Sequence, residues 1–210
     1  MLLFKAFSAL LSYPSEDMRQ ALPEIADIVS AAPLLDPPRR DDLLALIDEL
    51  GDGDLLTVEE RYVDLFDRGR ALSLHLFEHL HGESRDRGEA MVELKQLYEK
   101  AGFELTAREL PDYLPVVLEY LSCRELDEAR DMLADCGQIL GTIGRSLVAR
   151  RSRYAAVLQA LLVIAGESPI EVDKVPPVKE RMEALDREWA EQPAFGSPAS
   201  TGPATGAPAA

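Results

Sequence analysis

Apolar residues recur at helical spacing along most of this chain, and no segment shows the regular apolar–polar alternation of a β-strand. The first apolar stripe contains Leu3, Phe7 and Leu10, and the dipeptide Tyr13-Pro14 ends it. Similar stripes follow as far as residue 165. The pattern predicts an all-α fold, with a single compact multi-helix domain over residues 1–190.

Polar residues at three positions predict where helices begin. Ser15 is expected to be an N-cap, because acidic residues follow it in the first turn. Thr57 and Glu60 have the spacing of a capping box. Asp112 lies between two prolines in the segment ELPDYLP and is expected to cap the helix that follows.

One long helix is expected from Leu126 to about Arg150, although three glycines weaken its pattern. Gly137, Gly141 and Gly144 recur at helical spacing, which favours close packing of another helix against them. A last apolar helix is expected over residues 154–165.

Composition and charge exclude several classes of function. The chain has 210 residues, of which 47% are hydrophobic, as in ordinary globular proteins. Its formal net charge of −16 repels the phosphates of nucleic acids and of anionic membranes, and it attracts basic partners. The sequence therefore predicts no nucleic-acid binding and no direct membrane insertion.

Further features indicate where the protein works. Cys123 and Cys136 match no metal-ligand spacing and are too few for a disulfide framework, which favours a reducing compartment. The start, MLLFKAFSALLSYPS, lacks the basic stretch and the cleavage site of a signal peptide. The most apolar stretch, residues 155–165, is shorter than the ~20 residues that span a bilayer. We expect a soluble, cytoplasmic monomer.

The end of the chain differs in composition from the rest. From Pro193 to Ala210 it has no charged residue and consists of Ala, Pro, Gly, Ser and Thr plus Phe195. Such a segment buries too little apolar surface to offset the entropy of ordering it. We expect a disordered tail over residues 191–210.

The segment HLFEH, from His75 to His79, fits the H-x-x-E-H pattern. In that pattern two histidines one helical turn apart bind zinc, and the glutamate between them acts as a general base. The alternative is a packed helix with the histidines at its flank, and we favour it because so short a pattern arises easily by chance. The sequence thus predicts no catalytic residue and no metal site.

Four arginines surround this segment: Arg68 and Arg70 precede it, and Arg85 and Arg87 follow it. Paired guanidinium groups can hold the phosphates of a cofactor. Aspartates and glutamates alternate with these arginines, so internal ion pairs are the favoured interpretation.

Three acidic residues, Glu60, Asp64 and Asp67, recur at i, i+4 and i+7 and so share one helix face. A solvated face is the simpler interpretation. The alternative is a surface that receives a basic peptide. In the same way, ELPDYLP is either an ordinary helix start or a shaped loop that presents Tyr113 to a ligand.

Three blocks of sequence resemble the NarJ-type chaperones of respiratory nitrate reductase, a family also called the nitrate reductase delta subunit. The blocks are LFDRGR, SLHLFEHLHGESRDRG and ELPDYLP, in that order. The resemblance is strongest over residues 62–121 and extends more loosely over 1–190. It implies a helical protein related to other chaperones of molybdenum oxidoreductases, the TorD- and DmsD-like proteins.

The resemblance also implies a function without catalysis. Members bind the N-terminal segment of the catalytic (alpha) subunit and assist insertion of the molybdenum–guanine dinucleotide cofactor before membrane anchoring. They hold no cofactor stably. A zinc-dependent hydrolase built on HLFEH is the alternative from another class.

The resemblance assigns candidate peptide-binding residues. Tyr62 and Phe66 match the Y-x-x-x-F signature of the family, and Glu109, Asp112 and Tyr113 match its E-x-P-D-H/Y segment, which is associated with leader recognition. Many relatives carry histidine where this chain has Tyr113. The acidic residues Glu60 and Asp64 complete the candidate site as its rim, and we expect an apolar groove near Tyr62, Phe66 and Tyr113.

Overall fold

The computed structural model describes residues 1–81, 85–105 and 109–178. Met1–Pro177 form one compact unit. The predicted boundary at residue 190 and the predicted disordered tail lie outside the described residues, and both remain predictions.

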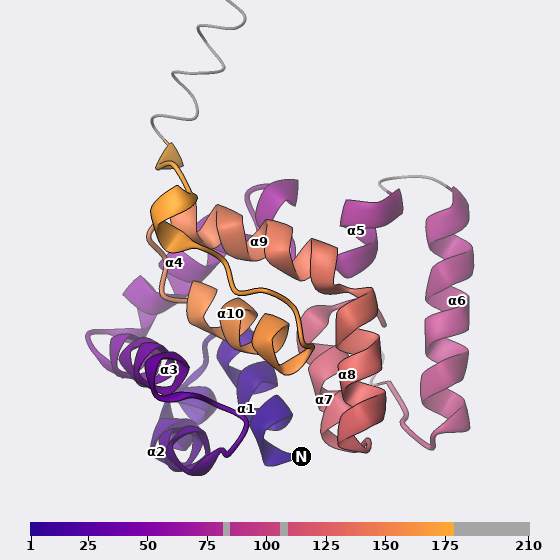
Figure 1. Ribbon diagram of the computed structural model, residues 1–210, viewed down its shortest axis with the longest axis horizontal. Coiled ribbons are helices and arrows are strands. Elements are labelled where there is room, and N and C mark those ends of the chain that lie inside the picture. Colours follow the sequence, from indigo (N-terminus) through magenta and orange to yellow (C-terminus); the bar gives the residue numbers. More distant parts are fainter. Residues whose placement is uncertain (82–84, 106–108, 179–210) are drawn as a thin grey trace, which may run out of the picture. The chain divides into compact units, whose positions relative to one another are not determined.

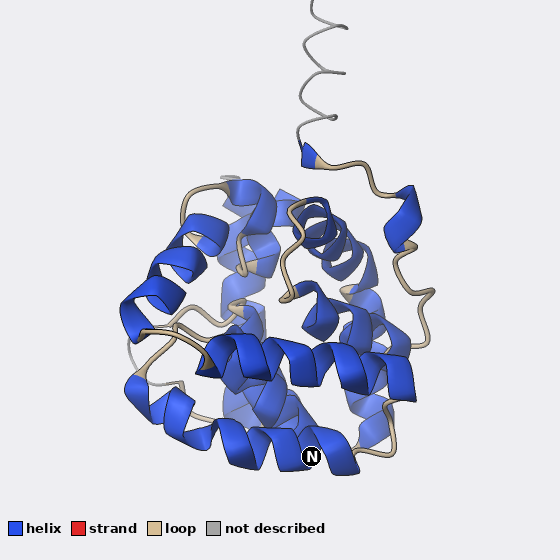
Figure 2. Cartoon of the chain, turned by 90° about the vertical axis from the view of Figure 1, so that its left-hand side faces the viewer, coloured by secondary structure: helices blue, strands red, loops and turns tan. Residues whose placement is uncertain are grey.

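The described residues form α-helices and two short 3-10 helices, and they contain no β-strand (Figure 1; Figure 2). The predicted all-α fold is confirmed. In chain order the elements are α1 (Leu2–Leu11), α2 (Glu16–Ala31), α3 (Pro37–Gly51), α4 (Leu55–Phe66), η1 (Arg70–Leu72), α5 (Leu76–His81), α6 (Arg85–Lys100), α7 (Leu114–Ser122), α8 (Leu126–Asp135), α9 (Gly137–Ala149), α10 (Ala155–Ile164) and η2 (Val172–Lys174).

The core lies around α1 and α10, which are apolar on most of their faces. Phe4 and Phe7 of α1 and Leu158 and Leu161 of α10 are fully buried. Helix α1 packs chiefly against α7, and the Ser8 hydroxyl links the two helices by donating to the Pro115 carbonyl at 2.8 Å. Each large apolar side chain buried in this way stabilises the fold by about 1.5–3 kcal/mol. None of the described helices combines the length and the apolarity that crossing a membrane requires.

Two helix starts test the predicted caps. Ser15 is the N-cap of α2, as predicted, and its hydroxyl accepts a hydrogen bond from the Met18 N–H. The prediction for α4 is wrong by three residues, because Asp54 is the N-cap and its carboxylate accepts from the Thr57 N–H at 3.0 Å. The Asp54 carboxylate also accepts a hydrogen bond from the Thr57 hydroxyl at 2.7 Å. Thr57 is therefore a donor to the N-cap and not the N-cap itself.

The long helix expected from Leu126 to Arg150 is in fact two helices, α8 and α9, which meet at Cys136. The glycine at position 137 begins the second helix and weakens any continuous helix through this point. The close packing expected at the glycines holds at Gly144, where a Cβ atom would overlap the Cδ1 of Ile170 and lie 3.3 Å from the Cβ of Leu158. Both neighbours come from the chain after α9.

Helix α6 lies at the edge of the compact unit, beside α5 (Figure 1). Among its described side chains only Tyr98 is fully buried. The ring of Tyr98 contacts those of Phe103 and Tyr120, and its hydroxyl donates to the Pro111 carbonyl at 2.9 Å. One aromatic residue therefore joins the end of α6 to the loop that precedes α7.

Candidate functional site

Two segments that are far apart in the sequence pair at the start of α7. The Leu114 N–H donates to the Leu74 carbonyl at 2.8 Å, and the Leu76 N–H donates to the Asp112 carbonyl at 3.0 Å. These bonds form an isolated antiparallel bridge between His75 and Tyr113, whose rings lie 5.2 Å apart. The bridge brings the HLFEH and ELPDYLP segments into one site.

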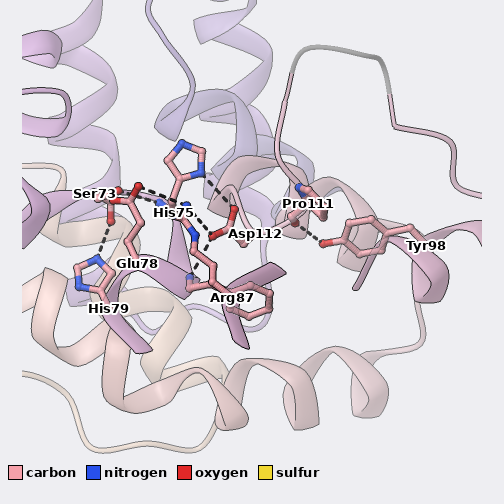
Figure 3. Close-up of polar contacts among 9 residues, drawn as sticks. Ser73, His75, Glu78, His79, Arg87, Tyr98, Pro111 and Asp112 are labelled. Carbon is pink, nitrogen blue, oxygen red and sulfur yellow. Dashed lines mark hydrogen bonds and ion pairs between the residues drawn. The ribbon is translucent and has the colours of Figure 1, made fainter. Parts of the chain in front are cut away.

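The Asp112 side chain is fully buried at the centre of this site (Figure 3). Its carboxylate accepts from the Phe77 N–H at 3.1 Å, and His75 Nδ1 lies 3.2 Å from its other oxygen. An Arg87 nitrogen lies 3.9 Å away, within ion-pair distance. The carboxylate thus ties α5, α6 and the loop before α7 together.

The predicted capping role of Asp112 is wrong, because Tyr113 is the N-cap residue of α7 and makes no side-chain capping bond. Phe77 lies in the first turn of α5, so the Asp112 carboxylate satisfies an N–H at the start of that helix instead. A long-range contact therefore replaces the local cap that the sequence suggested.

The HLFEH segment does not form the geometry of the zinc-binding alternative. His75 precedes α5, so the two histidines do not share one helical face. The Nε2 of His79 lies 2.8 Å from the Ser73 carbonyl, to which it donates, and His75 is held by Asp112 (Figure 3). Within residues 1–81, 85–105 and 109–178, no group of three or more potential ligands could hold a metal ion.

Two of the four candidate arginines form ion pairs, each with a different acid. Arg87 pairs with Glu78 at 3.3 Å, and the exposed Arg68 pairs with Asp64 at 3.0 Å. Arg70 is exposed, and the side chain of Arg85 lies outside the described residues. Ion pairing is thus observed for two of the four, and contact with cofactor phosphates remains a prediction for all of them.

Tyr62 and Phe66 point into the core, with 3% and 6% of their surface exposed. The Tyr62 hydroxyl donates to the Leu11 carbonyl at 2.8 Å, so the Tyr113 hydroxyl, 2.9 Å away, donates to Tyr62. Burial raises the pKa of Tyr62 far above its ordinary value. The predicted groove cannot therefore expose Tyr62 and Phe66 directly, and only Tyr113 of the three is partly accessible.

Accessible groups surround the buried Tyr62. The ring of Tyr13, which is half exposed, lies 5.6 Å from that of Tyr62 and perpendicular to it. Burial raises the pKa of Tyr113, and the carboxylates of Glu109 and Asp67 act in the same direction. We call Tyr13, Tyr113, Asp67 and Glu109 the tyrosine surface.

Tyr13 was not among the predicted site residues, because the sequence indicated only that it lies at the end of a helix. No spacing signal links Tyr13 to Tyr62, because their contact depends on the packing of α4 beside the end of α1. Glu60 and Asp64 are both exposed on α4, and their role as the rim of a peptide site remains a prediction.

A separate groove of about 860 Å³ lies between α2 and α3. Leu22, Ala26 and Ile47 give it apolar walls, and its charged lining includes Asp48 and Asp52 as well as Arg19 and Arg153. No pattern in the sequence predicts this groove, because it depends on how the two helices pack. Apolar surface with charged groups beside it therefore also occurs away from the tyrosine surface.

Comparison with known proteins identifies the family. The family model of the nitrate reductase delta subunit matches residues 15–159. NarJ of Escherichia coli (strain K12), a nitrate reductase molybdenum cofactor assembly chaperone, is 41% identical over 88% of this chain and 80% of NarJ. NarW of the same strain is 39% identical over 91% of this chain and 82% of NarW.

A solved structure supports the fold alone. A protein from Archaeoglobus fulgidus, described as a redox enzyme maturation protein, aligns with a TM-score of 0.52 at 23% identity. The alignment covers 78% of this chain and 92% of that one. With the family model and the NarJ identity, these likenesses agree with the resemblance of the three sequence blocks: the chain belongs to the nitrate reductase delta subunit family.

Proposed function

We propose that this protein is an assembly chaperone of respiratory nitrate reductase. It binds the N-terminal segment of the apo catalytic subunit in the cytoplasm and assists insertion of the molybdenum cofactor before membrane anchoring. The observation that carries the proposal is the 41% identity with NarJ over 88% of the chain. The protein acts as a monomer, catalyses no reaction and keeps no cofactor bound.

The tyrosine surface supports recognition of a basic, amphipathic segment. Tyr13 and Tyr113 offer aromatic faces, and the carboxylates of Asp67 and Glu109 act electrostatically on Tyr113. Aromatic side chains dominate the affinity of many interfaces, whereas exposed carboxylates mainly set orientation and association rate. Residues 1–67, which include Tyr13 and Asp67, contain fifteen acidic and five basic residues, so basic partners are attracted to this part of the chain.

The buried members of the candidate site have a supporting role in this proposal. Tyr62 holds Tyr113 through their hydroxyl groups, and Phe66 packs against the Tyr62 ring at 4.8 Å. Asp112 fixes the backbone on either side of the bridge between His75 and Tyr113. These residues set the shape of the surface that Tyr13 and Tyr113 present.

The function is tested by co-purification. The chaperone is captured from cells that express the catalytic subunit either whole or without its N-terminal segment. We expect capture of the whole subunit and loss of capture without the segment. Equal capture of both forms would show that recognition occurs elsewhere on the catalytic subunit.

The location is tested by calorimetry with a peptide from the start of the catalytic subunit. Tyr13→Ala should weaken binding about tenfold, as for an aromatic residue at an interface. Glu60→Gln with Asp64→Asn should cause a smaller loss that nearly vanishes at high salt, because exposed charges are screened there. The control is Asp48→Asn in the α2–α3 groove; if this variant alone weakens binding, the peptide occupies that groove instead.

A further inference from the structure

The corner between α9 and α10 carries four consecutive residues with three positive charges, Arg150, Arg151, Ser152 and Arg153. In a chain with a net charge of −16 this is an unusual concentration of arginine. Arg150, Arg151 and Arg153 are exposed. Arg151, Ser152 and Arg153 line a cavity of about 270 Å³, together with Asp42 of α3.

The backbone of Arg151 is in the left-handed region, with φ of 56°. Among the described residues it is the only non-glycine residue with a positive φ, since the others are Gly53, Gly102 and Gly166. The left-handed conformation is unfavourable for any residue with a Cβ atom. An arginine at this position therefore lowers the stability of the fold relative to a glycine.

The same cap occurs at three helix ends and allows a direct comparison. After α9, the Ser152 N–H donates to the Leu147 carbonyl at 3.0 Å and the Arg151 N–H donates to the Val148 carbonyl at 2.8 Å. This is the Schellman arrangement, in which glycine is preferred at the left-handed position. Gly102 and Gly166 occupy that position in the matching bonds after α6 and α10. The cap explains the backbone conformation of Arg151 but not the choice of arginine.

The guanidinium groups of Arg150 and Arg153 have partners among the described residues, in contrast to that of Arg151. Arg150 donates to the Ser146 carbonyl at 3.1 Å, and Arg153 pairs with Glu49 at 3.0 Å. No described residue makes a hydrogen bond or an ion pair with the Arg151 side chain. A guanidinium group that lines a cavity without a partner retains its five donors for a ligand.

We propose that the α9–α10 corner binds a small phosphate-bearing anion, with Arg151 as its main ligand. The guanidinium of Arg151 donates two parallel hydrogen bonds to phosphate oxygens, and Ser152 and Arg153 supply further donors. The cavity holds roughly nine water molecules, which suits a phosphate or a diphosphate group with some water. Asp42 opposes the anion and limits its affinity. This site does not depend on the proposed chaperone function.

The test uses calorimetry of the full chain with inorganic diphosphate as the probe, at an ionic strength of about 0.15 M. We expect one saturable site per chain. Arg151→Gly should weaken binding about tenfold, because it removes charge-assisted hydrogen bonds. Arg150→Gln, which removes the same charge beside the cavity, should change the affinity by less than about twofold. Asp42→Asn should tighten binding about threefold, because it removes the opposing charge.

Thermal unfolding without the anion separates ligand binding from a structural role. Arg151→Gly should raise the melting temperature by about 2 °C, because glycine relieves the left-handed backbone. A lower melting temperature would mean that the arginine stabilises the fold, which overturns the proposal. Absence of diphosphate binding, or equal losses in Arg151→Gly and Arg150→Gln, would also overturn it. A parallel titration with ADP shows the source of the anion: tighter binding than diphosphate indicates a nucleotide, and equal binding indicates the free anion.

Discussion

Replacing Asp112 by asparagine should destabilise the protein strongly, although the two side chains have nearly the same shape. The fully buried carboxylate accepts the Phe77 N–H and His75 Nδ1 on its two oxygens. An asparagine offers only one acceptor oxygen, and its NH₂ group takes the place of the other. The NH₂ group either opposes the Phe77 N–H or requires the His75 tautomer with its proton on Nε2, and in both cases a hydrogen bond to a buried charge is lost.

The magnitude follows from these contacts. Losing a hydrogen bond to a buried charged group costs about 1.5–3 kcal/mol. The weaker contact to Arg87, at 3.9 Å, adds at most about 1 kcal/mol, because that side chain is partly exposed and keeps its ion pair with Glu78. We expect a loss of about 3 kcal/mol in the free energy of unfolding, which lowers the melting temperature by roughly 6–12 °C.

Urea unfolding followed by far-UV circular dichroism measures this change, with an unchanged dependence on denaturant concentration. Glu109→Gln is the matched control, since this acid lies in the same loop but is exposed, and it should change the free energy of unfolding by less than about 0.5 kcal/mol. If Asp112→Asn is as stable as that control, the carboxylate does not hold α5, α6 and the α7 loop together.

Other expectations concern thiols, tyrosines and glycines. Cys136 should react with iodoacetamide far more slowly than the exposed Cys123, because burial raises the pKa of its thiol to about 11; equal rates by mass spectrometry would contradict its burial. Burial also raises the pKa of Tyr62, so the phenol stays protonated in the folded state while the unfolded state ionises above pH ~10. Stability should therefore be unaffected by this residue below pH ~10 and fall above it. In the ultraviolet titration, Tyr62→Phe should lower the amplitude of the high-pH phase by one tyrosine without abolishing it, because burial also raises the pKa values of Tyr98 and Tyr154. Gly144→Ala should cost about 1–3 kcal/mol, because its new methyl group meets Ile170 and Leu158, whereas Gly88→Ala on the open face of α6 should stabilise the protein by about 0.5–1 kcal/mol. Chemical denaturation compares the two, and similar effects of both substitutions would refute the close packing at position 144.

The sequence predicted features that depend on local chemistry. Ser15 was predictable as an N-cap because both the acceptor hydroxyl and the Met18 N–H lie within one turn. The apolar stripe of the first helix identified Phe7 and Leu10 as core residues, since helical spacing alone places them on one face. The family signatures were also visible as uninterrupted blocks.

Features that depend on distant contacts were not predictable. Asp112 had the position of an ordinary cap, and only folding brings the Phe77 N–H to its carboxylate. Tyr62 and Phe66 matched a family signature, but no spacing rule shows that both side chains face the core rather than a ligand. Tyr13 lies in the site because its ring packs against that of Tyr62 in α4, which is a tertiary contact. Tertiary contacts thus decided which members of the candidate site are accessible.

The molybdenum content of the nitrate reductase catalytic subunit tests the central claim most directly. The subunit is purified from cells that contain this protein, from cells that lack it, and from cells in which it is restored. Our account predicts a catalytic subunit that is still made but deficient in molybdenum without the protein, with the content recovered on restoration. A catalytic subunit that carries its full molybdenum content in cells without the protein would contradict the account.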